Sequence, residues 1–289
     1  GRTDFAKTKA FEYPIGDYHQ KTNFASIEKQ LDSDQDLFIS ESQSIVDDIV
    51  NQFALDLKKM NPVQLSKLDR LENLKLRSAL TSKLVKLLDR SFTQTFKESQ
   101  LLARLEVKKS TYGQSGIRDN FAILPASEFL DTLTTEDLNF IYDWEYNLTK
   151  ATRVKIIAAI KDGLPISSVI DSLNGELKQD AMVAIDRYAR TKFTEVMNKG
   201  RLEFFNSTGA VAGYQYAAVL DDRTTEICSQ LHGKLFKSGD EPVPPLHFSC
   251  RSTLVPITIY EKFEPDTEVN GEDIEKFIED NKGKGFAKQ

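Results

Sequence analysis

The stretch that decides the fold of the C-terminal half is residues 221–251, DDRTTEICSQLHGKLFKSGDEPVPPLHFSCR. It holds both cysteines and two of the three histidines of this 289-residue chain. These four side chains are Cys228, His232, His247 and Cys250, and four such donors are enough to close a tetrahedral zinc site. Zinc would cross-link helix, loop and strand where apolar residues are few, which is the usual task of a structural zinc.

Two other interpretations of the same residues stay open. In the first, Cys228 and Cys250 are buried free thiols, His247 is a hydrogen-bonded structural histidine, and His232 is solvated. In the second, an oxidising setting joins the two cysteines in a disulfide. The spacing C-x3-H and H-x2-C matches no common zinc-finger pattern, in which both pairs are closely spaced.

Around this window the sequence predicts short elements. Alternation over residues 214–220 indicates a strand. Residues 223–231 are expected to form a short helix, and Asp221 or Asp222 is able to cap its N-terminus. One extended segment is expected to begin at residue 235, and another is expected to cover residues 252–259. Arg223 and Arg251 flank the cysteines, and we expect them to pair with the nearby aspartates; an anion site is the alternative.

Upstream of the window the pattern is helical. The longest predicted helix is 177–205, where apolar and small residues recur at steps of three and four: Met182, Ile185, Ala189, Phe193, Val196, Gly200 and Phe204. Gly200 in this series suggests close approach by a neighbouring backbone. Further helices are expected at 129–146, at 166–174, and at 152–162, which Gly163 would end in a left-handed conformation.

Two apolar stripes precede these helices. One begins at Asp36 and stops at Asn61-Pro62, and the next includes Leu65, Leu84 and Phe96, so an antiparallel helical hairpin is expected. The fold class is therefore mainly α, with an N-terminal helical hairpin or bundle and an α+β C-terminal domain that holds a long helix and a two- or three-stranded sheet. Predicted boundaries are an extended arm at 1–33, a helical domain at 34–107, a linker at 108–125, a second domain at 126–260, and an acidic tail with a short helix at 261–289.

Composition narrows the class of protein. Hydrophobic residues make up 40% and charged residues 28%, which is ordinary for a soluble protein, and no apolar run is long enough to span a membrane. The net charge is −6, but residues 261–280 hold nine acids and two lysines, so the rest is nearly neutral. A general polyanion binder would be more basic, and we expect at most weak, local contact with DNA.

Several motifs together resemble a known family, the Mu F-like minor head proteins, also called phage head morphogenesis proteins. The residues that carry the resemblance are Ala189-Arg190-Thr191, Gly200-Arg201, Asp221-Asp222-Arg223-Thr224, Leu231-His232-Gly233 and Pro244-Pro245-Leu246-His247-Phe248-Ser249-Cys250-Arg251. The resemblance covers about residues 150–260 and marks 126–260 as the head-morphogenesis domain. Many relatives have a cysteine where Thr225 stands here.

The resemblance implies a minor capsid protein of a tailed phage or prophage, incorporated with the portal protein during procapsid assembly. Its partners would be the portal and other head components, its location the virion or procapsid interior, and the host cytoplasm during assembly. Asp222, Arg223, Thr224, Gly233, Pro244, Pro245 and Arg251 would form a structural signature.

We expect no catalytic residues, because H-E-x-x-H, the paired zinc-deaminase motifs and the P-loop are all missing from the sequence. The alternative function is a zinc-dependent hydrolase or nuclease, or a toxin-type effector carried by a phage particle. A stand-alone DNA-binding module is a third interpretation, which the near-neutral body of the chain disfavours.

Overall fold

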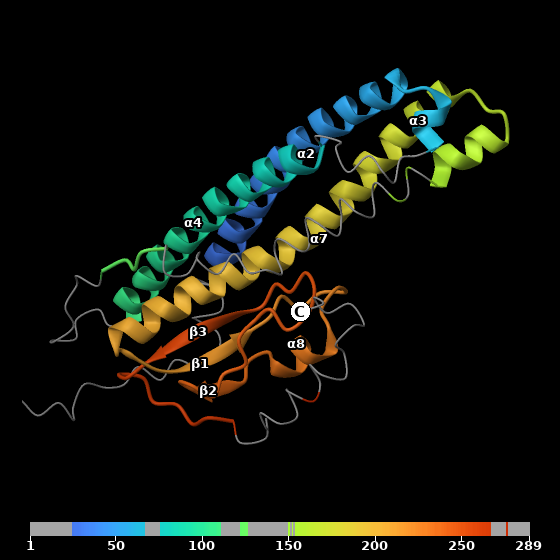
Figure 1. Ribbon diagram of the computed structural model, residues 1–289. Coiled ribbons are helices and arrows are strands. Elements are labelled where there is room, and N and C mark those ends of the chain that lie inside the picture. The colour runs from blue at the N-terminus through green and yellow to red at the C-terminus, as the bar shows by residue number, and fades with distance from the viewer. Residues whose placement is uncertain are drawn as a thin grey trace, which may run out of the picture. The chain divides into compact units, whose positions relative to one another are not determined.

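The computed structural model describes residues 25–66, 76–110, 122–126, 150, 152, 154–266 and 276 (Figure 1). The helices and strands named there are α2 (Ala25–Lys59), α3 (Pro62–Ser66), α4 (Leu76–Ser110), α7 (Ile166–Thr208), β1 (Val211–Ala217), α8 (Glu226–Leu231), β2 (Leu235–Lys237) and β3 (Thr253–Thr258). Long helices dominate, and one small antiparallel sheet follows them along the chain. The predicted fold class is confirmed.

The chain divides into two compact units. The sheet unit combines Gly1–Ser33, Gln94–Ala126 and Arg190–Gln289, and the helical unit combines Asp34–Thr93 and Ser127–Ala189. Helices α2, α4 and α7 each contribute residues to both. The boundaries predicted from the sequence cut the chain into consecutive segments, whereas each unit is assembled from separate segments.

In the helical unit, α2 and α7 run antiparallel. Lys58 near the end of α2 pairs with Asp171 near the start of α7 at 2.6 Å, and Lys178 pairs with Asp47 at 3.4 Å. The predicted stripe of α2 is buried: Phe38, Val46, Ile49, Phe53 and Leu57. Burial of such a stripe supplies most of the stabilisation of a surface helix, because helix propensity alone is weak.

Helices α2 and α4 form the predicted antiparallel hairpin. Within the helical unit Arg90 pairs with Glu41, and within the sheet unit Gln30 donates to Glu98. The lower residue number on α2 is thus paired with the higher residue number on α4, as in an antiparallel pair. Helix α2 stops where Asn61-Pro62 predicts. Asn61 then caps α3, since its Oδ1 accepts the Gln64 N–H while Gln64 Oε1 accepts the Asn61 N–H, both at 2.9 Å.

Helix α2 begins earlier than predicted. It starts at Ala25, inside the segment 1–33 that the sequence assigns to an extended arm. Ile27 and Leu31 lie one turn apart and are both buried, so the apolar stripe of α2 extends to its first turn. Asp32, Asp34 and Asp36 obscure this in the sequence, because aspartate is a weak helix former.

Helix α7 joins two helices that the sequence predicts as separate. It spans Ile166–Thr208, so the predicted helices 166–174 and 177–205 are one. The sequence suggests a break at Asn174-Gly175 because glycine disfavours a helix interior. Leu173 and Leu177 on either side are both buried, and their packing outweighs that preference. The predicted end of the preceding helix is confirmed, since Gly163 has a φ of +65°.

The sheet has the strand order β2-β1-β3, and both pairs are antiparallel. Tyr214 of β1 is opposite Phe236 of β2 and Pro256 of β3. Pro256 stands on an edge strand, where its missing N–H leaves no gap in the ladder. The predicted strand 214–220 is three residues too late, because the chain leaves the sheet after Ala217 and Leu220 is exposed.

One hydrophobic core holds the sheet unit together. Helices α4 and α7 contribute Ala103, Val107, Phe204 and Phe205, and the segments after them contribute Ala210, Tyr214, Tyr216, Ala218, Ile227, Cys228, Leu231, Phe236, Leu246, Cys250 and Leu254. Both cysteines are therefore core residues. Their surroundings exclude water, so an unpaired polar group there is costly.

The first residues of the predicted acidic tail are attached to the sheet. Asp266 receives the Leu235 N–H on its Oδ2 at 2.7 Å and donates its own N–H to the Leu235 carbonyl at 2.9 Å. These bonds cover part of the outer edge of β2. Most of the tail lies outside the described residues, as do the predicted helix at 129–146 and most of the linker. In the described part of the chain, no helix combines the length and apolar character that a bilayer span requires.

Candidate metal site

Cys228 is placed by the short helix α8. Ile227, Cys228 and Leu231 are the buried residues of this six-residue helix, and they anchor it on the core of the sheet unit. The Cys228 sulfur lies 3.3 Å from the Tyr216 hydroxyl of β1. One hydroxyl thus faces a thiol inside an apolar core.

The predicted cap of α8 is wrong. Thr225 is the N-cap, and no side chain makes the capping hydrogen bond. Asp221 instead accepts the Arg223 N–H on Oδ1 at 3.0 Å and accepts the Thr224 N–H on its carbonyl at 3.1 Å. Asp221 therefore shapes the turn before the helix, a local arrangement that competes with capping.

His247 and Cys250 come from the loop between β2 and β3. The Pro244–Pro245 peptide bond is cis, Leu246 is buried in the core, and Ser249 adopts a left-handed φ of 52°. The Ser249 N–H donates to the Thr191 hydroxyl of α7 at 2.9 Å, which holds the residue in this uncommon conformation. The turn brings His247 and Cys250, three residues apart, to the same site.

Helix α7 fixes the backbone on both sides of Cys250. The Thr194 hydroxyl lies 2.7 Å from the Cys250 carbonyl, and Asn198 Nδ2 donates to the Ser252 carbonyl at 3.1 Å. Arg201 donates to the Thr253 hydroxyl and pairs with buried Glu106 of α4 at 2.7 Å. The polar residues at 191, 194, 198 and 201 form one stripe, which we call the α7 polar stripe.

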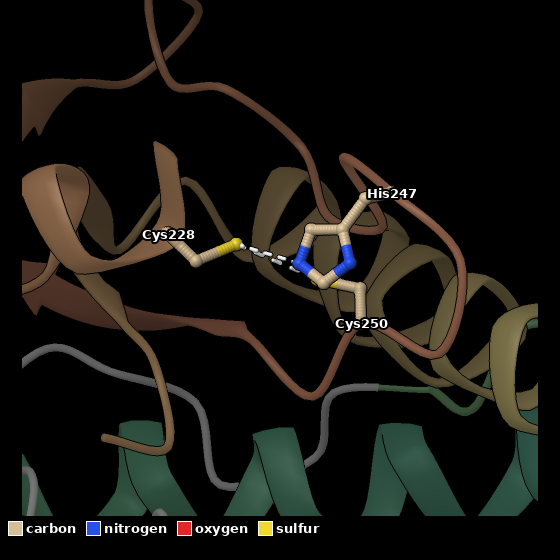
Figure 2. A group of neighbouring side chains, drawn as sticks. All are labelled: Cys228, His247 and Cys250. Carbon is tan, nitrogen blue, oxygen red and sulfur yellow. Dashed lines mark hydrogen bonds between the residues drawn. The ribbon is translucent and has the colours of Figure 1, made fainter. Parts of the chain in front are cut away.

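The three donor atoms converge (Figure 2). Cys228 Sγ lies 3.2 Å from His247 Nε2 and 3.8 Å from Cys250 Sγ. All three donor atoms lie within 4.8 Å of one another. Cys228 and Cys250 are free thiols, so the structure contains no disulfide between them.

The protonation of this group is strongly coupled. The hydrogen bond with Cys250 holds the pKa of the Cys228 thiol well below its usual range, against the effect of burial and with a further contribution from His247. The same bond and burial raise the pKa of Cys250. Burial opposes protonation of His247, but the bond to Cys228 and its charge outweigh burial and raise the pKa of His247. One negative charge on the sulfur pair is thus favoured even without a cation.

The geometry fits a tetrahedral metal ion. At Zn–S and Zn–N distances of about 2.3 and 2.0 Å, tetrahedral ligands are separated by about 3.8 Å for S···S and about 3.5 Å for S···N. The observed 3.8 Å and 3.2 Å are close to these separations. His247 Nδ1 lies 2.8 Å from the Phe248 carbonyl, which can only accept, so Nδ1 carries a proton and Nε2 is the ring nitrogen that would bind a cation. Zinc or a similar borderline cation would be held by Cys228, His247 and Cys250.

His232, the fourth donor predicted from the sequence, is not part of this group. Its Nδ1 accepts the Ala218 N–H at 3.1 Å, and its backbone N–H donates to the Cys228 carbonyl at 3.0 Å. The ring closes the turn between the end of β1 and the end of α8. The four-residue spacing between Cys228 and His232, which suggests a pair of ligands in the sequence, is explained equally well by this structural role.

The rest of the predicted signature shapes the loops. Arg251 donates to Asp221 at 2.5 Å, and Arg223 lies 3.6 Å from the same carboxylate, so the expected ion pairing is confirmed. The bond to Arg251 holds the pKa of Asp221 far below its usual range. Gly233 has a φ of +83°, which favours glycine. Asp222 is exposed, and the Thr224 hydroxyl bonds to the Val219 carbonyl.

Sequence reasoning missed Tyr216 and most of the α7 polar stripe. Thr191 and Arg201 enter the family resemblance without a role, and Thr194 and Asn198 are not singled out. A signal was present, because 191, 194, 198 and 201 are spaced three, four and three apart. Polar residues at helical spacing beside an apolar seam indicate a second buried face.

The fold and the site together define a mainly helical protein with a small antiparallel sheet, in which a Cys/His group brings together α8 and the loop before β3. Residues 150–255 match the family model described as Phage Mu protein F like protein, so this part of the chain is similar to that family. The match contains all three donors and the α7 polar stripe. Searches of curated proteins and of solved structures found no match.

Proposed function

We propose that the chain is a structural protein of a tailed-phage head, a minor component incorporated with the portal protein during procapsid assembly. The observation that carries the proposal is the match of residues 150–255 to the Mu F-like family. The physical character of the matched region supports it, because the signature residues make turns, ion pairs and buried contacts. Head components would be its partners, and the procapsid or virion its location.

We also propose that Cys228, His247 and Cys250 hold a structural zinc. The zinc would supply a cross-link between α8 and the loop before β3, where the local secondary structure is short. Burial of both sulfurs and the fixed tautomer of His247 prepare the group for a cation.

The test of the particle role is assembly of procapsids from the cognate shell, scaffold and portal proteins with this chain present. Quantitative mass spectrometry of the purified particles should find the chain at low copy number relative to the main shell protein. Omitting the portal protein should lower its incorporation while particles still form. Particles that exclude the chain, or that are fully infectious without it, would contradict the proposal.

The alternative function is a zinc-dependent hydrolase or nuclease, or a toxin-type effector. One observation favours it, because three protein ligands leave a coordination position that catalytic zinc sites also leave open. Turnover of a phosphodiester or peptide substrate, abolished by His247→Ala without loss of folding, would establish it. Weak, strongly salt-dependent DNA binding would fit the structural role, whereas tight binding that persists at high salt would not.

A further inference from the structure

The predicted four-ligand zinc site is incomplete in one respect. Among the residues that the structure describes, the group of possible metal ligands contains Cys228, His247 and Cys250 and no fourth Cys, His, Asp or Glu side chain. Zinc in structural sites almost always has four ligands. The identity of the fourth ligand therefore decides whether this is a closed site or one that exchanges a ligand.

His232 is committed to another task. Its Nδ1 accepts the N–H of Ala218, and Ala218 is buried. Turning the ring toward the thiols would leave that backbone N–H without this acceptor, at a cost of about 1–3 kcal/mol. The ring is thus better placed as a turn support than as a ligand.

The side chain of Thr225 also bears on the identity of the fourth ligand. Its hydroxyl is buried and has no hydrogen-bond partner in the protein. It stands at the N-cap of α8, three residues before Cys228 in the chain. Native proteins rarely leave a buried hydroxyl unsatisfied, and a small bound molecule is a common partner.

We propose that a metal ion at this site has three protein ligands and one exchangeable ligand, a small monodentate donor such as water, hydrogen-bonded by the Thr225 hydroxyl. This rests on the zinc binding proposed above. His247 is only half-buried, whereas both sulfurs are fully enclosed, so a small ligand reaches the site from the histidine side. Imidazole and small anions are the class of external ligand that would replace water there.

The test uses the full chain loaded with Co²⁺, whose visible absorption reports the number and type of ligands. His232→Gln and His247→Gln make the same chemical change at the two histidines of the window. We expect His232→Gln to keep the spectrum and to change the metal Kd less than about threefold. This is smaller than the effect of losing a hydrogen bond that supports a metal ligand. His247→Gln should weaken binding more than tenfold, with circular dichroism confirming that both variants fold.

Added imidazole should shift the spectrum of the wild-type protein at constant bound Co²⁺. Thr225→Val keeps the branched side chain and removes the hydroxyl, and it should change the imidazole affinity severalfold without changing the metal stoichiometry. A loss of affinity in His232→Gln equal to that in His247→Gln would overturn the inference and leave zinc binding intact. So would a spectrum that imidazole does not change. Failure of the wild-type protein to bind Co²⁺ or Zn²⁺ would overturn zinc binding and the inference together.

Discussion

Cys250 is completely buried, and its sulfur faces the Cys228 sulfur at 3.8 Å. If zinc joins them, Cys250→Ser should remove the metal and lower Tm by several degrees, because the cross-link between α8 and the loop is lost. A chelator should lower Tm of the wild-type protein similarly. Ser229→Ala, an exposed change on the same helix, serves as the control. Well under one zinc per chain by elemental analysis, with no chelator effect, would end the structural-zinc proposal.

Asp221 gives a residue-scale prediction for pH. Its folded-state pKa is lowered, chiefly by the bond to Arg251, so its contribution to stability is complete above the unfolded value of 3.8 and is lost as pH falls below it. The Tm difference between wild type and Asp221→Asn should therefore be small but measurable at pH 7 and should shrink at pH 3. A difference that grows on acidification would show that this ion pair does not stabilise the loop.

At the scale of the element, Thr194 connects α7 to the site. Thr194→Val keeps the shape of the side chain and removes the hydroxyl that bonds to the Cys250 carbonyl at 2.7 Å. The metal Kd should rise about 10–100-fold, as for other outer contacts of metal ligands. Thr194→Ser should restore binding. Equal loss of binding in both variants would assign the effect to packing and not to the hydroxyl.

Gly200 of α7 packs directly against α4 in the sheet unit. A Cβ placed there would lie 2.0 Å from Ser99 Oγ and 3.0 Å from the Phe96 carbonyl oxygen. Gly200→Leu should therefore destabilise the protein by about 1–3 kcal/mol in chemical denaturation. Glu203→Ala, at an exposed position one turn later, should have little effect. Comparable losses from the two would mean that the contact face of α7 is wrong.

A double substitution sharpens this prediction. Gly200→Ala combined with Ser99→Ala removes the nearest atom, so the pair should be less destabilising than the sum of the single changes. The rescue should be partial, since the Phe96 carbonyl belongs to the backbone and cannot rotate away.

How far the sequence predicts these elements depends on whether the deciding contact is local. The seam of α7 follows from spacing alone, and six of its seven residues are buried in the structure, with Met182 half-buried. Cys228, His247 and Cys250 are equally evident from clustering. The position of His232 is not, because its partner is a backbone N–H fourteen residues earlier, at the end of β1. The start of α2 is obscured for the same reason, since its aspartates disfavour a helix that packing stabilises.

At the scale of the whole molecule, the first turns of α2 belong to the sheet unit. Ile27 and Leu31 are buried there, and together with Glu28 and Asp32 they line a small cavity whose other wall includes Arg251, Ser252 and Thr253. This segment therefore supports the backbone that follows Cys250. The arm predicted from the sequence must be divided at Ala25, between residues that belong to α2 and those before it.

Two truncations separate folding from incorporation into particles. Removing residues 1–24 leaves all of α2 and should leave Tm unchanged. Removing residues 1–33 also removes the buried side chains of Ile27 and Leu31. Losing one buried aliphatic side chain lowers the free energy of unfolding by about 2–5 kcal/mol, so Tm should fall clearly. If residues 1–24 act as a docking arm, both truncated chains should be found in procapsids at reduced copy number, the shorter truncation with its fold intact by circular dichroism. Full incorporation of the chain that lacks residues 1–24 would reject the docking arm, and a fall in its Tm would show that those residues serve folding instead.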